Sequence, residues 1–452
     1  MTIPSLTLAS LALAALPCRI QILDQENGWP VPLVELTTTH NVSFWTDNAG
    51  VAAFDLPDLM GGETWLTVNS DGYEAPADGF GYRGFRFTPK PGGAFTFKVK
   101  RTSIAKRLGR ITGGGLFGES QKLGERLDWK ESGVLGCDSI QTATHKGKLF
   151  WLWGDTALAG YPLGLFHASS ATLPLKPLAR FQPPLALNLT YFRDGKGQPR
   201  NVANLFPDDP GPTWLGGTVS LRDAGGQSHL VATWTKIEPP MSSYRIGLCE
   251  WDEAALNYRS LKTLWEKKSG APEPSLIPMG HASFWKDSSG KEWLLFGDPF
   301  PSIKMPASYE AWKDPSTWQK VETPEFLVSR DGGKVKPHRG SIAWNAYLKR
   351  WVAIFCEIGG KPSPLGEIWF SESQSPFGPW GKAVKVLSHQ KYTFYNPLIH
   401  PNLTPEGSPI LLFEGTYSQM FSDSPSKTPR HDYNQILYRL DLDDPWLNAA
   451  QT

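Results

Sequence analysis

The sequence predicts an all-β protein in which an N-terminal antiparallel β-sandwich precedes a five-bladed β-propeller. Runs that alternate polar and apolar residues with a period of two are frequent, whereas long stretches with helical periodicity are scarce. With 44 Gly and 39 Pro among 452 residues, the chain has the turn residues that many short strands need. A hairpin pattern with polar residues at both ends also recurs at unequal intervals from about residue 134 onward, which is typical of a propeller.

The chain opens with the apolar run TIPSLTLASLALAA, which has small residues near a potential cleavage point. This composition predicts a signal peptide over residues 1–17, and with it a secreted or periplasmic protein. No Lys or Arg precedes the run, so a buried first strand is the alternative. No other stretch has the length of a membrane-spanning helix, and we expect no membrane partner.

Residues 18–100 form the predicted sandwich. Their alternation breaks at Asn27-Gly28 and again at residues 47–50, which suits short strands joined by tight turns. Residues 101–133 are expected to be a linker. The sandwich segment resembles transthyretin-like or carboxypeptidase-regulatory-like domains, and this resemblance implies an accessory module without chemistry of its own. The residues that carry it are Asp24, Gly28, Pro30, Thr46, Asp47, Gly50 and Phe54.

Residues 134–445 contain the repeated hairpins of the predicted propeller. The clearest hairpin runs from Asp138 to Asp155, 17 positions later, with a Lys-Gly turn between its two strands. A propeller hairpin starts and ends on the same side, so both of its ends border one central funnel. The sequence therefore predicts that five polar pairs converge on one place. The other hairpins run from Thr218 to Thr235, His281 to Asp298, Arg339 to Glu357 and Asn396 to Glu414.

Several carboxylates at one funnel indicate acid–base chemistry on a glycosidic bond. Such hydrolysis needs one carboxyl group that protonates the leaving oxygen and another that attacks the sugar or activates water. Crowding raises the pKa of one acid and leaves another ionised. We predict that Asp138, Asp155 and Glu357 include these two carboxyl groups. The side chains predicted to bind the sugar are Trp153, Trp234, Lys236, His281, Asp298, His338, Arg339, Asn396 and Glu414, with Trp214 and Tyr395 close by.

The hairpin ends resemble those of five-bladed propeller glycoside hydrolases. Gly154-Asp155-Thr156 and the segment GEIWFSESQSPFGPW over residues 366–380 are similar to the endo-D-arabinanase family. More distantly, Asp298-Pro299 and Cys356-Glu357 resemble motifs of the invertase-like and arabinanase/xylosidase-like families, although they fall in other blades. The resemblance implies that the carboxylates that open and close the first hairpin are the catalytic pair, with Asp138 as base or nucleophile and Asp155 or Glu357 as general acid. It also implies a furanoside-containing or other complex polysaccharide as substrate.

Two other functions remain open from the sequence. A polysaccharide lyase on the same fold would use His281, His338 and Arg339 as the base and as the cation that neutralises a uronate. A non-catalytic propeller would bind carbohydrate without turnover. The number of acids disfavours this second alternative, because a lectin for neutral sugars has little need of several mutually repelling carboxylates.

Charge and cysteine content narrow the partners and cofactors. A net charge of +1 gives no basis for nucleic-acid binding. Cys18, Cys137, Cys249 and Cys356 are widely spaced, so buried single thiols are expected rather than a zinc site, with one disulfide as the alternative after export. We expect no cofactor and no catalytic metal, with a structural Ca²⁺ in the funnel as the open alternative. The expected partner is a polysaccharide or oligosaccharide, bound by a monomer.

Overall fold

The computed structural model describes residues 16–160 and 168–451, and its N-terminal part is a β-sandwich. The signal peptide predicted over residues 1–17 lies, apart from Leu16 and Pro17, outside the described residues. Burial alternates strictly along the first strand, as the period-two pattern predicts, and the inner faces enclose one apolar core. The sheets have the orders β4 (Val51–Phe54), β1 (Cys18–Asp24), β8 (Ala94–Arg101), β6 (Tyr73–Glu74) and β3 (Ser43–Trp45), β2 (Glu35–Thr38), β5 (Thr64–Asn69), β7 (Gly84–Phe87).

One strand pair in the sandwich differs from the predicted antiparallel pattern. β1 pairs with β8 in parallel, with Arg19 opposite Ala94 and Asp24 opposite Val99. A short turn joins only antiparallel neighbours, whereas parallel strands need a long connection. Here the chain between β1 and β8 builds the second sheet before it returns, which explains the parallel pair. The remaining pairs within the two sheets are antiparallel.

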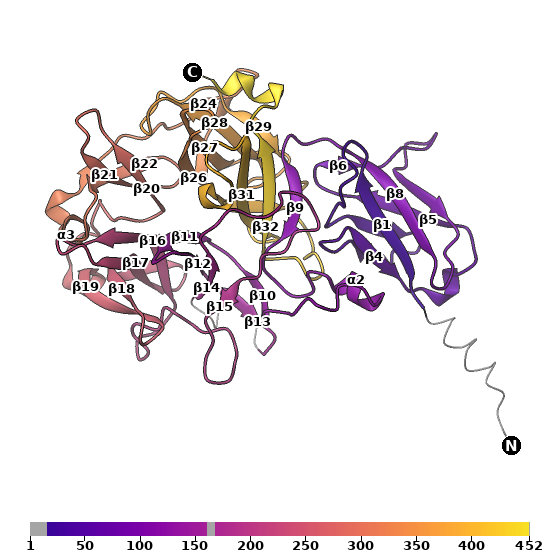
Figure 1. The fold of residues 1–452 in the computed structure, drawn as a ribbon, viewed down its shortest axis with the longest axis horizontal. Coiled ribbons are helices and arrows are strands. Elements are labelled where there is room, and N and C mark those ends of the chain that lie inside the picture. Colours follow the sequence, from indigo (N-terminus) through magenta and orange to yellow (C-terminus); the bar gives the residue numbers. More distant parts are fainter. Residues whose placement is uncertain (1–15, 161–167, 452) are drawn as a thin grey trace.

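The second part of the described chain is a five-bladed propeller, whose blades are arranged around a common centre in Figure 1. Each blade is a four-stranded antiparallel sheet, and its first strand lies innermost. Blade 1 consists of β11 (Gln141–His145), β12 (Lys148–Trp153), β14 (Ser169–Pro174) and β15 (Thr190–Tyr191), and blade 2 of β16 (Thr213–Arg222), β17 (Ser228–Glu238), β18 (Ser242–Asp252) and β19 (Asn257–Glu266). Blade 3 consists of β20 (His281–Lys286), β21 (Glu292–Gly297), β22 (Pro301–Pro306) and β23 (Gln319–Lys320). Blade 4 consists of β26 (Pro337–Asn345), β27 (Arg350–Glu357), β28 (Ile368–Ser373) and β29 (Val384–Leu387).

The fifth blade combines strands from both ends of the propeller sequence. Its inner strands are β30 (Thr393–Ile399), β31 (Ile410–Ser418) and β32 (Asn434–Asp441), and its outermost strand is β9 (Lys106–Arg110). β9 lies beside β32 at the edge of the ring that faces the sandwich (Figure 1). The segment 101–133 is therefore more than the predicted linker, because its first part closes the ring through backbone hydrogen bonds.

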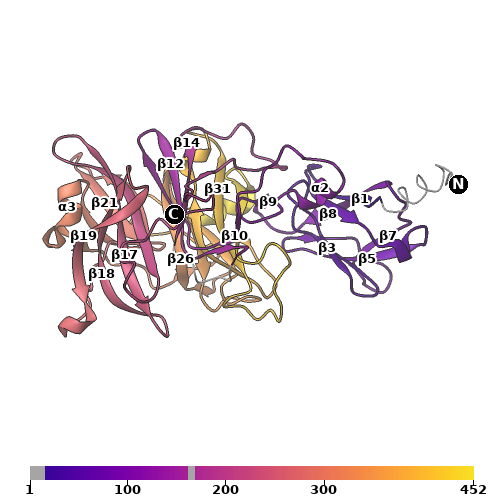
Figure 2. The same ribbon diagram turned by 90° about the horizontal axis from the view of Figure 1, so that it is seen from below.

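A turn of the sandwich docks on this closing strand. The Asn48 side chain is fully buried; its Nδ2 donates to the carbonyl oxygens of Arg110, at 2.7 Å, and Leu185, at 3.1 Å. Its Oδ1 accepts from the Arg110 backbone N–H at 3.0 Å. The neighbouring Asp47 accepts from the N–H of Ser120 in the short helix α2 (Gly118–Lys122). The sandwich therefore lies directly against the propeller along the long axis of the molecule (Figure 2).

Shorter elements complete the described fold. Two-residue to four-residue strands form the pairs β10 (Val134–Cys137) with β13 (Thr156–Leu158) and β24 (Leu327–Val328) with β25 (Lys334–Val335). The remaining helices are α3 (Tyr309–Lys313) and the 3₁₀ turns Pro57–Leu59, Lys267–Ser269, Pro315–Thr317, Pro401–Leu403 and Pro445–Ala450. None of the helices in the described part is long and apolar enough to cross a membrane. The four cysteines all lie in that part, where they are buried and unpaired.

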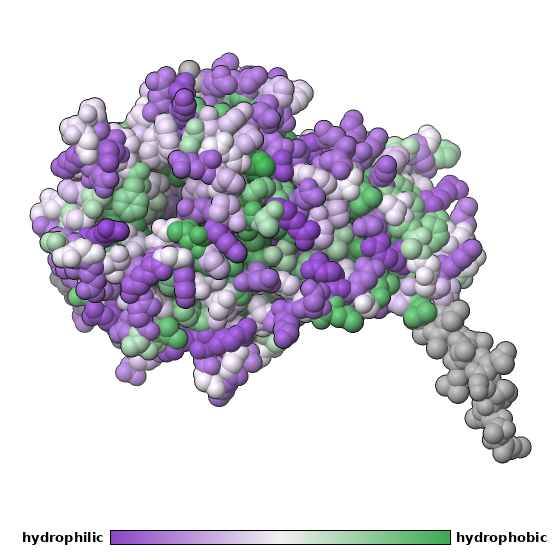
Figure 3. All heavy atoms as spheres, viewed as in Figure 1, coloured by the Kyte–Doolittle hydropathy of each residue, from purple (hydrophilic) through white to green (hydrophobic). Residues whose placement is uncertain are grey.

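A cavity of about 300 Å³ runs along the centre of the ring. All five innermost strands contribute to its wall, and the surface is hollowed where β20 and β26 meet (Figure 3). The predicted site residue His281 lies on this wall, together with hydroxyl groups of the neighbouring blades. The propeller therefore has a central cavity, but its lining comes mainly from the middles and turn-side ends of the inner strands, and Asp138 and Asp155 are not part of it.

Candidate active site

The two aspartates of the first hairpin are neighbours in space. β10 pairs with β13, and Cys137 lies opposite Thr156 at the end of this pairing. Asp138 directly follows β10 and Asp155 directly precedes β13, so the two aspartates are next to each other. The backbone N–H of Asp138 donates to the carbonyl of Asp155 at 3.3 Å, and the N–H of Gly154 donates to the carbonyl of Asp138 at 2.8 Å. Backbone hydrogen bonds thus fix both acids beside each other, at the start of β11 and the end of β12.

Hydrogen-bond donors from other blades hold the Asp138 carboxylate. Tyr395, in the innermost strand of blade 5, donates its hydroxyl to Asp138 Oδ2 at 2.9 Å. The side chains of Tyr433 and Ser139 also hydrogen-bond this carboxylate. Burial raises the pKa of Asp138, and these donors oppose the rise because they stabilise the ionised form. The carboxylate is therefore oriented by groups that favour its negative charge.

Asp155 has a different environment. Burial, and next the charge of Asp138, raise the pKa of Asp155 to about 7, and a hydrogen bond from the Trp214 side chain opposes the rise. Within the described residues, Asp155 Oδ1 is buried and has no hydrogen-bond partner. The pair therefore combines an acid that is protonated near neutral pH with a neighbour whose donors favour its ionised form.

The backbone around Asp138 is left-handed at three positions. Ser139, Asn396 and Tyr433 have φ angles of 54°, 51° and 60°, in a region that Asn tolerates but that strains Ser and Tyr. Asn396 donates from Nδ2 to Ser139 Oγ at 2.9 Å, so two of these three residues bond each other. Asn396, predicted to bind substrate, thus lies next to Asp138 and supports the loop that carries it.

The predicted residues of blades 3 and 4 form a second group. Asp298 accepts from the Gly340 backbone N–H at 2.7 Å and from the Arg339 guanidinium at 2.6 Å. Burial lowers the pKa of both His281 and His338, and the charge of Asp298 opposes this effect at each imidazole. The Arg339 side chain keeps 52% of its surface exposed. Asp298 therefore links two blades, and Arg339 presents a cation to solvent.

Two predicted aromatic residues are core residues instead of sugar-binding ones. Trp153 is 1% exposed and stacks on Tyr191, with ring centroids 5.4 Å apart. Trp234 is fully buried and donates its indole N–H to the carbonyl of Leu248. Both side chains point between sheets because successive residues of a strand face opposite sides, and both sides of a blade pack on neighbours. The prediction that they contact substrate is wrong for this structure.

Two predicted charged residues are also enclosed. Lys236 is fully buried, and its ammonium group donates to the carbonyl of Gly211 at 2.7 Å. Glu414 is fully buried, accepts from the indole N–H of Trp151 at 3.2 Å and lies 3.4 Å from His400 Nε2. Buried charges require such partners, and here the partners are internal. These two residues therefore hold the inside of the ring together rather than border its funnel.

Glu357, the alternative general acid, belongs to a separate part of blade 4. It accepts from the indole N–H of Trp369 in the next strand outward, at 3.0 Å. Its backbone N–H donates to the carbonyl of Glu367, a buried acid paired with Lys385. No hydrogen bond in the described structure connects Glu357 to the aspartate pair. Asp155 is therefore the better-placed partner for Asp138.

Tyr433 is the site residue that the sequence pattern did not indicate. It precedes β32, the third strand of blade 5, and not the start or end of an inner hairpin. Its carbonyl accepts from the Cys137 N–H, and its side chain hydrogen-bonds Asp138. Only the closure of the ring brings blade 5 beside blade 1. Sequence spacing carries no signal for such a contact.

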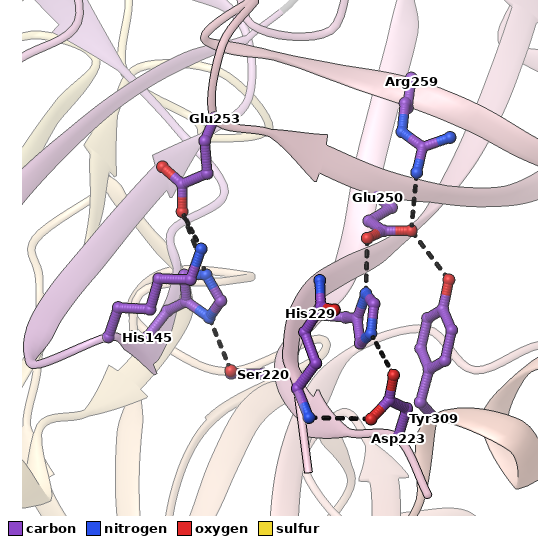
Figure 4. A network of polar contacts seen from close by, with 10 residues as sticks. His145, Ser220, Asp223, His229, Glu250, Glu253, Arg259 and Tyr309 are labelled. Atoms are coloured by element: carbon purple, nitrogen blue, oxygen red, sulfur yellow. Dashed lines mark hydrogen bonds and ion pairs between the residues drawn. The ribbon is translucent and has the colours of Figure 1, made fainter. Parts of the chain in front are cut away.

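A cluster of titratable residues lies on blade 2, away from the aspartate pair (Figure 4). His229 contacts Glu250 at 2.6 Å and Asp223 at 3.2 Å, and its ring stacks on Tyr309 with centroids 4.0 Å apart. Tyr309 and Arg259 complete the hydrogen bonds of Glu250. Each member is therefore satisfied by the others, and the cluster joins α3 of blade 3 to blade 2.

The described residues include no group of three His, Cys, Asp or Glu side chains arranged to hold a metal ion. The structural Ca²⁺ considered above therefore has no such ligand set among these residues.

Comparison with known proteins gives structural matches only. The sequence matches no family profile and no curated protein. An exo-1,5-α-L-arabinanase from a bovine ruminal metagenomic library aligns over 69% of this chain and 94% of its own, with 10% identity and a TM-score of 0.38. A Bacillus subtilis arabinanase aligns over 68% and 96%, with 11% identity and a TM-score of 0.36. An exo-β-1,3-galactanase from Phanerochaete chrysosporium aligns over 68% and 61%, with 8% identity and a TM-score of 0.38. Similarity at this level does not assign an activity.

Proposed function

We propose that this protein is a glycoside hydrolase whose catalytic pair is Asp138 and Asp155. The observation that carries the proposal is the contrast between these two neighbouring acids. One has a pKa raised to about 7 and a buried carboxyl oxygen without a partner among the described residues, and the other accepts hydrogen bonds from tyrosine hydroxyls. Two carboxyl groups in unequal environments are what glycosidic bond hydrolysis requires.

The geometry supports one assignment of roles. Asp155 donates its proton to the glycosidic oxygen as the bond from that oxygen to the anomeric carbon breaks. In its ionised form, Asp138 acts in one of two ways, held by Tyr395. It attacks the anomeric carbon and forms a glycosyl ester, which water then hydrolyses as Asp155 takes the proton of that water, or it takes a proton from the water that attacks the sugar directly. The first route retains and the second inverts the configuration of the released sugar, so nuclear magnetic resonance of the fresh product distinguishes them.

The proposed substrate is a neutral, furanoside-containing polysaccharide. The similarity of Gly154-Asp155-Thr156 and residues 366–380 to the endo-D-arabinanase family supports it. The second group of residues is consistent with an uncharged substrate, because its cation, Arg339, is paired with Asp298. A uronate-cleaving lyase would need that cation for its substrate.

The test is incubation of the purified protein with D-arabinan, L-arabinan, β-1,3-galactan and xylan, followed by measurement of new reducing ends. Asp138→Asn and Asp155→Asn should each lower the rate by about 10²–10⁴-fold, whereas Asp331→Asn, in an exposed turn, should leave it unchanged. Equal release by wild type and Asp138→Asn would refute the assignment. An unsaturated uronate product from a uronate-containing polymer would instead identify a lyase, and binding without release would identify a lectin.

A further inference from the structure

An exposed aromatic side chain lies beside the aspartate pair. Phe421, in the loop after β31, has 56% of its surface exposed. Its ring packs edge-on against Tyr395, with centroids 5.8 Å apart, and Tyr395 donates to Asp138. One side chain thus separates Phe421 from the proposed nucleophile or base. A molecule bound at Asp138 would have this ring within reach of its next unit.

The loop holds Phe421 in an unfavourable backbone conformation. Its φ of 58° is in the left-handed region, which costs a bulky residue about 1–2 kcal/mol. Hydrogen bonds within the loop impose it: the Gln419 N–H donates to Asp432 at 2.6 Å, Gln419 Nε2 to the carbonyl of Ser424 at 2.8 Å, and Ser422 Oγ to the carbonyl of Gln419 at 2.7 Å. Neither burial nor backbone preference accounts for an aromatic residue here.

The contrast with another exposed aromatic residue sharpens the point. Phe80, on a sandwich turn, is 92% exposed, and single exposed apolar residues of this kind need no special explanation. Phe421 differs because it combines exposure with a strained, hydrogen-bonded loop and with contact to a residue of the catalytic group. Strain that the surroundings maintain at such a place indicates a role in binding.

We propose that Phe421 is the stacking platform for the sugar unit next to the one cleaved. The ligand is a neutral glycan whose ring presents a face of C–H groups to the phenyl ring. This inference rests on the proposed hydrolase function, and it extends that function by a specificity-determining residue. It also implies that the substrate spans at least two sugar units at the site.

The test measures binding separately from cleavage. Phe421→Asn removes the ring, and Asn tolerates the left-handed conformation, so the loop loses its platform without new strain. In an Asp138→Asn background, affinity for soluble D-arabinan, L-arabinan, β-1,3-galactan and xylan is measured by calorimetry. Loss of most of a buried Phe contact should weaken binding about 10- to 100-fold. Asp138→Asn/Phe80→Asn is the matched control and should bind as Asp138→Asn does.

The outcomes separate this inference from the proposed function. Weaker binding by the Phe421→Asn variant, with Phe421→Trp restoring it, supports the platform, even if wild type releases no reducing ends and the hydrolase proposal fails. Cleavage by wild type together with unchanged affinity and unchanged KM in Phe421→Asn would overturn the platform and leave the hydrolase standing. If Asp138→Asn binds none of the four glycans, this result would also overturn the platform proposal.

Discussion

The substitution Gly154→Ala tests whether the position of the Asp138 carboxylate matters. Gly154 lies between the two aspartates in space, and a Cβ added to it would lie 2.5 Å from Asp138 Oδ1 and 3.2 Å from Ser139 Cβ. Ordinary contact requires about 3.4 Å, so the carboxylate must move by about 0.9 Å. The φ of Gly154 is outside the left-handed region, so the Ala backbone itself is unstrained.

The expected consequence is a large loss of activity with a modest loss of stability. A displacement of about 1 Å in a catalytic group lowers the rate about 10²-fold, because the reacting atoms leave their productive geometry. Overpacking costs about 1–3 kcal/mol of folding free energy, which a domain of this size tolerates. The hydrogen bond from Tyr395 to Asp138 should also lengthen, since Tyr395 is held by its own strand.

The assay is kcat/KM on the glycan that the wild type cleaves, alongside thermal unfolding followed by circular dichroism. Gly195→Ala is the control, because a Cβ at that exposed glycine meets no described atom within 4 Å. We expect Gly195→Ala to match wild type in both measurements. Activity of folded Gly154→Ala within twofold of wild type would show that the Asp138 carboxylate is not the group that reacts.

Two further predictions concern stability. The pKa of Asp155 is raised to about 7 from 3.8, so its ionisation destabilises the fold progressively as the pH rises from about 4 to 7. At pH 8, Asp155→Asn should therefore raise Tm and increase the free energy of unfolding by about 1–2 kcal/mol, after allowance for partial exposure. At pH 4 it should leave both unchanged. A lower Tm at pH 8 would contradict this. Asn48→Ala removes three buried hydrogen bonds between the sandwich and the propeller and should cost about 2–4 kcal/mol in urea unfolding, whereas exposed Asn188→Ala should cost little.

The repeated hairpins could be recognised from sequence because they are local. A hairpin whose two strands are adjacent in the chain brings its ends together whatever the rest of the fold does, so the spacing from Asp138 to Asp155 was sufficient. The closure of the ring is not local. β9 and β32 pair across more than 320 positions, and the basic sequence of β9 resembles a solvated linker as much as an edge strand. Tyr433 escaped notice for the same reason.

The wrong site residues share a physical cause. Position near a hairpin end was the reason for assigning Trp153, Trp234, Lys236 and Glu414 to the site. The sequence predicted the position of a residue along its strand better than the direction in which its side chain points. In a sheet with one solvated face, alternation would settle that direction. Neighbouring blades cover both faces of a propeller blade. Alternation therefore only shows which of two buried faces a side chain lies on, and does not show whether it reaches the rim of the funnel. Buried Lys236 and Glu414 then reflect internal pairing, which only the structure reveals.

Strain and contrast at the first hairpin support one interpretation of the site. Ser139, Asn396, Tyr433 and Phe421 all have φ near 50–60°, and all belong to the blades that meet at Asp138. Folding stability alone would favour Gly at such positions, since Gly adopts this region without cost. The retained side chains each contact the site: Ser139 and Tyr433 bond the carboxylate, Asn396 bonds Ser139, and Phe421 packs on Tyr395. A fold that keeps three strained residues and two acids with raised pKa values in one place gives up stability there, which supports the proposal that Asp138 is oriented for a reaction.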